Sequence, residues 1–243
     1  DLKEIEREIQ KTHPEFTLQL IYTSLKFLDK NIVEKELEKA YQLKKQYPDF
    51  ITGFDLVADE ATGNTVGYFS PLWKNMKNLE KKYGVKIPLY LHAGESCSIY
   101  NKNISEIPLA DNKRIGHALN LIYFPSLMEK VKQQQKLVEI SPISNQILGY
   151  VSDLRNHPAR VLLANNVNLS INSDDPGVFG YDGLSYDFWM AFMNWDLTVK
   201  DLKTLIFNSI DYSSLNSSEK QKAKIHLEKE WNERAENTDA KYF

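Results

Sequence analysis

The residues best suited to chemistry in this sequence are two histidines and three carboxylates. His92, His117 and Asp174 each follow an apolar run, and Glu95 and Asp175 lie close behind them. Imidazole nitrogens and carboxylate oxygens bind divalent metals such as zinc, and a nearby carboxyl group can transfer a proton. The pattern therefore predicts that His92 and Asp174 hold a metal, while Glu95 and Asp175 handle protons and substrate.

Each residue of this set also has a purely structural reading. An isolated histidine in a strand is often a core residue that hydrogen-bonds the backbone, and Glu95 alone could be a surface carboxylate. Gly94 favours function, because a glycine lets the backbone approach a ligand closely. In an apolar pocket, desolvation would raise the pKa of Glu95 and keep a proton available to donate. His117 could bind the metal or orient a hydroxide.

Asp174 and Asp175 precede Pro176 and Gly177, so they could simply form a turn. Two adjacent carboxylates repel each other, however, unless a cation or a hydrogen-bond donor engages one of them. We therefore expect Asp174 to be a metal ligand and Asp175 to accept a hydrogen bond from the substrate.

The elements that must position these residues alternate along the chain. Apolar, β-branched runs alternate with charged amphipathic stretches, which is typical of βα units and a parallel sheet. The predicted strands are residues 18–23, 51–57, 87–92, 114–118, 137–141 and 167–172. The predicted helices between them are 32–47, 70–83, 126–136 and 157–165, and those after them are 184–195, 198–210 and about 217–237. Asn216 and Glu219 resemble a capping pair for the last helix.

Polar residues at the ends of so many strands favour a TIM-type (β/α)8 barrel, an α/β fold whose active sites lie at the carboxyl ends of the strands. Six strands do not close such a barrel, so we expect an incomplete one with extra C-terminal helices. An open, doubly wound sheet is the alternative. The absence of repeats and linkers predicts a single domain over residues 1–243.

Composition excludes several classes of protein. The formal net charge of −3 and the absence of a basic stripe argue against nucleic-acid binding. No apolar run is long enough to cross a membrane, and the charged residues 1–7 do not resemble a signal peptide. Cys97 is the one cysteine, which excludes an intrachain disulfide and a thiolate-rich zinc site.

The sequence resembles the adenosine deaminase superfamily, and within it the secreted adenosine deaminase-related growth factors. The likeness extends over nearly the whole chain. The matching segments of the superfamily are His92-Ala93-Gly94-Glu95, Arg114-Ile115-Gly116-His117 and Ser173-Asp174-Asp175-Pro176. The segments matching the growth factors are residues 13–16, 53–57, 142–146, 151–158 and 183–188.

The resemblance implies a zinc-dependent barrel that hydrolyses adenosine, and also 2′-deoxyadenosine, to inosine and ammonia as part of purine metabolism. By this resemblance His92 and Asp174 bind one Zn²⁺, and Glu95 protonates purine N1. His117 orients the attacking hydroxide and accepts its proton, and Asp175 accepts a hydrogen bond from the N7 side of the base.

The sequence departs from the family it resembles at two small residues and in the zinc ligands. Ala58 stands where the family has a glycine whose N–H reaches purine N3, and Ala118 replaces the second glycine of Gly-His-Gly. The His-x-His pair that supplies two more zinc ligands in the family does not occur in this sequence. We therefore expect a C-terminal piece of a longer protein, which lacks the first two βα units, a dimerising extension and a signal peptide.

Two alternatives concern function. One is a catalytically inactive family member that binds adenosine or acts as an extracellular growth factor. The other, a deaminase of adenosine monophosphate, is disfavoured because no basic cluster near the motifs could hold a phosphate. The sequons at Asn103 and Asn216, expected in exposed positions, are consistent with secretion. Asn168 falls in a predicted buried strand and is expected to be unmodified.

Overall fold

The structure, a computed structural model, describes residues 1–236 of the chain. In that part of the chain, parallel strands neighbour one another in chain order, the first two and the last four forming regular ladders. Single bridges from Leu89 to Phe54 and to Asn112 join the two ladders. The strands are β1 Leu20–Leu25, β2 Ile51–Val57, β3 His92–Ala93, β4 Arg114–His117, β5 Leu137–Ile140 and β6 Asn168–Ile171.

This strand order decides between the two predicted folds. A doubly wound sheet reverses its strand order at a switch point, whereas this sheet follows chain order from β1 to β6. The incomplete barrel is therefore confirmed, and the doubly wound alternative is wrong. Five of the six strands were predicted to within two residues of their observed bounds, and the prediction for β2 matches both of its bounds.

The third strand is less regular than its sequence suggests. An unbroken strand was predicted over residues 87–92, but ladder pairing is confined to β3, with isolated bridges at Leu89. Pro88 has no N–H to donate, which prevents regular pairing there. The Asn112 side chain takes over part of the pairing, because its Oδ1 accepts a hydrogen bond from the Leu91 backbone N–H at 2.7 Å.

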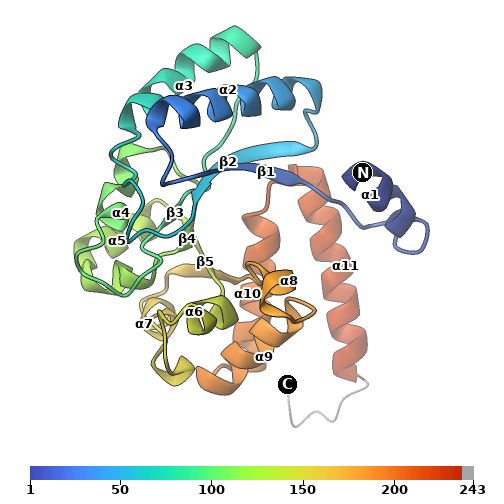
Figure 1. Cartoon of the computed structure of the whole chain (residues 1–243). Helices are drawn as coiled ribbons and strands as arrows, with labels where there is room; N and C mark the ends of the chain where they lie inside the picture. The colour runs from blue at the N-terminus through green and yellow to red at the C-terminus, as the bar shows by residue number, and fades with distance from the viewer. Residues whose placement is uncertain (237–243) are drawn as a thin grey trace.

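Helices cover the outside of the sheet (Figure 1). The helices that follow the strands in the first two thirds of the chain are α2 Lys30–Gln46, α3 Ser70–Tyr83, α4 Asn103–Glu106, α5 Pro125–Gln133, α6 Pro142–Ile147 and α7 Ala159–Ala164. The remaining helices are α1 Leu2–Gln10 at the start of the chain and α8 Pro176–Phe179, α9 Ser185–Asn194, α10 Val199–Asp211 and α11 Ser217–Glu236 after β6.

The sequence explains where the long outer helices begin and end. The Asp29 side chain caps α2 by accepting a hydrogen bond from the Asn31 N–H, and the buried residues of α2 follow helical spacing from Val33 to Tyr41. Helix α3 has a proline in its first turn and ends at Gly84, whose φ of 72° favours glycine. The predicted bounds of α3 match the observed ones.

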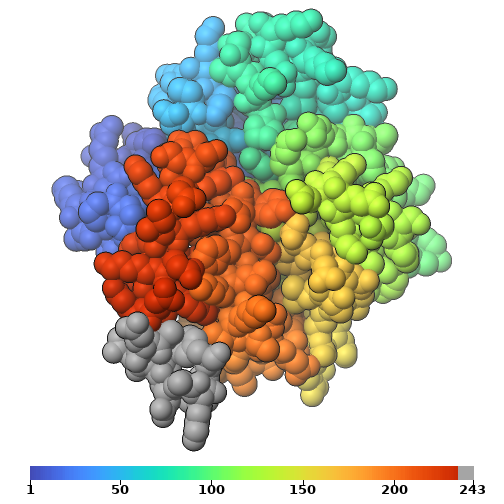
Figure 2. Space-filling model, turned by 180° about the vertical axis from the view of Figure 1, so that it is seen from behind, coloured from blue at the N-terminus to red at the C-terminus, as the bar shows by residue number. Residues whose placement is uncertain are grey.

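The C-terminal helices form much of the surface seen from behind (Figure 2). Helix α10 lies against the sheet, where the Asn208 side chain donates a hydrogen bond to the Leu169 carbonyl of β6. The predicted capping pair of α11 is confirmed, because Asn216 and Glu219 exchange backbone-to-side-chain hydrogen bonds of 2.9 and 3.1 Å. The predicted end of this helix at residue 237 lies outside the described residues.

The core lies between the sheet and its helices. Phe54 and Leu56 of β2, Ile115 of β4, Val138 of β5 and Leu169 of β6 are all fully buried in one continuous apolar cluster. Burial of this apolar surface is the main favourable contribution to folding, and it fixes the strands that carry the polar residues at their carboxyl ends.

The edges of the sheet are open. Within residues 1–236, no further strand pairs with the outer edge of β1 or of β6. Strand β1 is correspondingly more exposed than β2, whose residues are almost all buried. No helix in this part of the chain combines the length and the apolar character that a membrane span requires.

One sequon prediction is wrong. Asn103 was expected to be exposed, but it is 1% exposed, because its side chain accepts a hydrogen bond from the Val66 N–H and donates one to Asn101. Asn216 is exposed, as expected. Asn168 is half-buried in β6 and donates a hydrogen bond to the Tyr212 hydroxyl.

Candidate active site

The predicted polar residues meet in one cavity of about 780 Å³, which is lined by residues of β1 to β5 and by the segment that follows β6. His92 belongs to β3, His117 ends β4, and Asp174 follows β6 by three residues. Glu95 and Asp175 line the same cavity. The carboxyl ends of parallel strands lie at one edge of the sheet, which is why residues far apart in the sequence converge here.

Three of these side chains form a plausible donor set for a metal ion. Each of His92, His117 and Asp174 offers one ligand atom, and these atoms lie within 4.8 Å of one another. The His117 Nε2 atom is 3.7 Å from Asp174 Oδ2 and 3.5 Å from Glu95 Oε1. Two imidazole nitrogens and a carboxylate oxygen match the chemistry that zinc prefers, so the residues fit the group.

Asp55 of β2 orients His92. Its Oδ1 accepts a hydrogen bond from the His92 backbone N–H at 3.0 Å. Its Oδ2 lies 2.7 Å from His92 Nδ1, although the two atoms are not aligned as a hydrogen bond. A carboxylate on one ring nitrogen commonly leaves the other nitrogen of a histidine for a metal.

The buried charges shift one another's protonation. Desolvation raises the pKa of Glu95 to about 7, which the sequence analysis predicted for this carboxyl group. Burial disfavours the charged form of His92, but the Asp55, Glu95 and Glu139 carboxylates outweigh it and raise its pKa to about 9. Burial and the positive charge of His92 lower the pKa of His117 to about 3.

Helix α6, which follows β5, supports the site from behind. The Ser144 hydroxyl donates to Asp174 Oδ2 at 2.6 Å, and Asn145 contacts His117 Nδ1 at 3.0 Å. The other end of the Asn145 amide contacts His157 Nε2 at 3.1 Å. The sequence analysis placed His157 at the start of the predicted helix 157–165 and gave it no role in the site. Only the structure shows that the His157 side chain is buried, with 1% of it exposed.

Several site residues have a strained backbone. Ala58, His117, Ala118 and Asp174 have φ angles of 87°, 64°, 45° and 56°, in the left-handed region that side chains other than glycine's seldom adopt. Such strain clusters at functional sites, where surrounding structure over-determines it. Ala58 and Ala118 are the two positions at which the sequence departs from the glycines of the family it resembles.

The three predicted substrate-binding residues have different surroundings. Ala58 and Asp175 line the cavity. Asp175 precedes α8, but its side chain makes no capping hydrogen bond, so its carboxylate is not used by the turn. Gly94 is buried, and its N–H donates to Glu60 Oε2 at 2.8 Å. The structure thus gives the Gly94 N–H a partner within the protein.

The acids that follow β2 also differ in their roles. Asp59 is exposed and accepts hydrogen bonds from the Ala61 N–H and the Thr62 hydroxyl, which stabilises the local turn. Glu60 points inward and is buried beside Lys26. No sequence signal marks Lys26, since a lysine after a strand is usually solvated.

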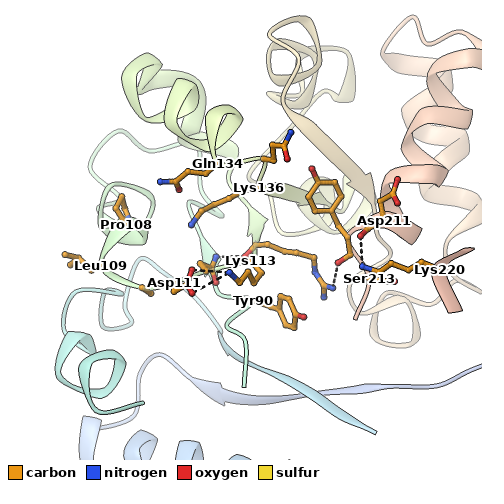
Figure 3. Close-up of a pocket in the computed structure, with 15 residues that line it drawn as sticks. Tyr90, Pro108, Leu109, Asp111, Lys113, Gln134, Lys136, Asp211, Ser213 and Lys220 are labelled. Atoms are coloured by element: carbon orange, nitrogen blue, oxygen red, sulfur yellow. Dashed lines mark hydrogen bonds and ion pairs between the residues drawn. The ribbon is translucent and has the colours of Figure 1, made fainter. Parts of the chain in front are cut away.

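A second cavity, of about 710 Å³, lies at the amino ends of β4 and β5 (Figure 3). Three of its four cationic residues have partners: Lys113 pairs with Asp111, and the Lys220 ammonium donates to the Asp211 carbonyl. Arg114 donates to the Tyr212 carbonyl. The cavity lacks the histidines and free carboxylates of the first one, so we assign no chemistry to it.

Comparison with known sequences identifies the family of the chain. Residues 2–229 match the family model described as adenosine deaminase. The chain is 37% identical to adenosine deaminase 2 of Sus scrofa over 94% of this chain and 46% of that protein. It is 38% identical to adenosine deaminase 2 of Dictyostelium discoideum over 84% of this chain and 38% of that protein. The chain thus spans about half the length, or less, of the curated relatives it matches.

Comparison with solved structures agrees with the fold. An adenine deaminase from Arthrobacter aurescens superposes with a TM-score of 0.70 at 24% identity, over 84% of this chain and 58% of that one. An amidohydrolase from Burkhoderia ambifaria with bound Zn superposes with a TM-score of 0.77 at 17% identity, over 96% and 61%. At these identities the likeness concerns the fold alone.

Proposed function

The chain belongs to the adenosine deaminase family, and we propose that the complete protein hydrolyses adenosine, and 2′-deoxyadenosine, to inosine and ammonia with one bound Zn²⁺. The observation that carries this proposal is the meeting of His92, His117 and Asp174 with Glu95 in one cavity. The curated relatives named adenosine deaminase 2 support the reaction.

Each site residue of this chain has its own role in the proposed reaction. His92 and Asp174 would hold the zinc, which when bound supplies a Lewis acid that makes water nucleophilic near neutral pH. Glu95, with a pKa of about 7, holds a proton at neutral pH and donates it to purine N1. Asp175 accepts a hydrogen bond from the N7 side of the base, and the Ala58 N–H donates to N3. His117 orients the attacking water.

The charge of the cavity favours a nucleoside over a nucleotide. Among the described residues that line it, Arg114 is the only lysine or arginine, and its guanidinium is bound by Glu139 at 2.5 Å. The lining otherwise includes the carboxyl groups of Asp59, Asp174 and Asp175. A phosphate group would meet repulsion there, so adenosine monophosphate is a poor substrate.

We further propose that protein outside this chain completes the barrel. The open edges of β1 and β6 leave room in the strand order for additional parallel strands, and the relatives are about twice as long as the chain. Added strands would bring further ligands, because a catalytic zinc usually has three from the protein. Secretion and a homodimer formed through the same outside region belong to this proposal, and the exposed sequon at Asn216 supports the former.

The test uses the complete protein with its upstream residues. It should contain about one zinc per chain, by elemental analysis, and convert adenosine to inosine. Glu95→Gln should lower kcat by roughly 10²- to 10⁴-fold and retain zinc, whereas His92→Ala should lose both. His226→Ala, at an exposed position of α11, is the matched control and should change neither.

A protein without zinc and without activity would belong to the non-catalytic alternative. A complete protein that contains no zinc and forms no inosine would overturn the proposal. Adenosine binding measured by calorimetry in that protein would then indicate the inactive, nucleoside-binding relative.

A further inference from the structure

A buried chain of hydrogen bonds extends from the backbone of α7 to His117. The Ala159 N–H donates to His157 Nδ1 at 3.0 Å, and His157 Nε2 lies 3.1 Å from Asn145 Oδ1. The Nδ2 atom of Asn145 lies 3.0 Å from His117 Nδ1. The side chains of His117, Asn145 and His157 are each 2% exposed or less, so water does not compete for these hydrogen bonds.

The backbone N–H at one end sets the direction of every bond. Because the Ala159 N–H can only donate, His157 Nδ1 is an acceptor, and the hydrogen of the neutral ring is on Nε2. That Nε2–H must meet an acceptor, which makes the facing atom of Asn145 its oxygen. The amide nitrogen of Asn145 therefore faces His117 and donates to its Nδ1. With Nδ1 accepting, the ring hydrogen of His117 lies on Nε2, the atom that faces Glu95 and Asp174.

We propose that Asn145 and His157 are positioning residues that hold His117 as the Nε2–H tautomer, a hydrogen-bond donor toward the reacting water. This inference rests on the proposed function for the role of His117 and deepens it. It differs from the role implied by the family resemblance, since an Nε2 that already carries a hydrogen cannot accept the proton of the water. That proton passes instead to Glu95, which is a carboxylate once it has protonated N1 and whose Oε1 lies 3.5 Å from His117 Nε2. Of the three candidate donors, it assigns His92 and Asp174 to the zinc and the Nε2–H of His117 to the water, because an N–H has no lone pair for a metal.

The surroundings make the chain of bonds rigid. The Asn145 backbone is held at both ends, since its N–H donates to the Ser141 carbonyl and its own carbonyl accepts from the Val151 N–H, each at 3.0 Å. The His157 ring lies 4.9 Å from the Trp195 ring, between centroids. Burial lowers the pKa of His157 to about 3, so this ring stays neutral and keeps its donor and acceptor distinct.

The first experiment reads the tautomer directly and needs no turnover. Long-range ¹H–¹⁵N spectra of the zinc-free complete protein with ¹⁵N-labelled histidine distinguish Nδ1–H from Nε2–H, with assignment from variants that each replace one histidine. We expect both His117 and His157 as Nε2–H tautomers. A His117 resonance typical of the Nδ1–H form, or of the doubly protonated ring, would overturn the proposal whether or not the complete protein deaminates adenosine.

The second experiment reverses the bond. Asn145→Asp has the same shape but cannot donate, so it should move the hydrogen of His117 to Nδ1. In the complete protein it should lower kcat roughly 100-fold or more, with KM changed less than about threefold. His157→Gln keeps a donor toward Asn145 Oδ1, and it should retain the Nε2–H form of His117. Asn156→Asp, at an exposed neighbouring position, is the control and should change neither tautomer nor kcat.

Two results of this second experiment would count against the proposal. One is an Asn145→Asp variant that folds and keeps both the Nε2–H tautomer and the kcat of the parent. The other is a His157→Gln variant that loses the Nε2–H form. If Asn145→Asp does not fold, the spectrum of the parent chain and the His157→Gln variant still decide the question.

Discussion

Lys26 and Glu60 form a buried ion pair beneath the segment that carries His92 and Glu95. The Lys26 ammonium also donates to the His92 carbonyl at 2.8 Å. Glu60 Oε2 accepts hydrogen bonds from the backbone N–H groups of Gly94 and Glu95, at 2.8 and 3.1 Å. Burial opposes ionisation of Glu60, but Lys26 outweighs it and holds the pKa of this carboxyl group below its usual value. The pair therefore fixes the backbone from which two site residues project.

Removing the lysine should leave a buried, unpaired carboxylate. We expect Lys26→Met to lower the free energy of unfolding by about 3–5 kcal/mol, measured by urea titration. Lys82→Met breaks the exposed pair with Glu38 and is the matched control, with little expected change. Equal effects of the two substitutions would show that the buried pair does not hold the segment.

A methyl group at Gly94 should disturb the same segment. Gly94 has a φ of 79°, and an added Cβ would collide with the Asn120 Oδ1 atom. Gly94→Ala should therefore lower the free energy of unfolding by at least about 2 kcal/mol. Gly177→Ala is the control, because a Cβ there meets no atom within 4 Å. A Gly94→Ala variant as stable as Gly177→Ala would contradict the observed backbone conformation.

The contact of Asp55 with His92 should affect metal binding. Asp55→Asn removes the negative charge beside His92 Nδ1 and weakens the orientation of the ring. We expect the zinc affinity of the complete protein to fall about 10- to 100-fold, as measured by competition with a chelator. The control is Asp111→Asn, whose carboxylate is exposed and far along the chain from the metal ligands. Unchanged affinity in Asp55→Asn would mean that Asp55 does not orient a zinc ligand.

His157 should make stability depend on pH. Its folded-state pKa is about 3 against an ordinary value of 6.5, so below pH 6.5 the unfolded chain binds a proton that the folded chain does not. Stability from this group is therefore complete above pH 6.5 and is lost as the pH falls toward 3, by up to about 1.4 kcal/mol per pH unit.

The measurement compares urea unfolding at pH 7 and pH 4.5. His157→Gln should lose less stability than the parent chain between these values, because glutamine does not titrate. His13→Gln, at an exposed position, should lose as much as the parent. If His157→Gln and the parent have the same pH dependence, His157 is not the neutral, buried ring described above.

Much of this architecture could be predicted from local sequence. The apolar runs of β2, β4 and β5 and the helical spacing of α2 and α3 repeat within a few residues, so the elements that they form are visible without tertiary contacts. Polar residues directly after apolar runs, such as His92 and Asp174, identified the carboxyl edge of a parallel sheet as the candidate site. The interrupted pairing over residues 87–92 could not be predicted, because it depends on how Leu89 bridges Phe54 and Asn112 on the neighbouring segments.

Apolar periodicity is a local property of the chain, so the order of residue types was enough to show which residues lie at the ends of which strands. The contacts of buried polar residues became visible only once the elements were packed: Lys26 with Glu60, Asn145 between His117 and His157, and Asn103 with Val66. These contacts join positions 12 to 37 residues apart. No local pattern records them, since they arise from side chains that fill the space left when strands and helices pack.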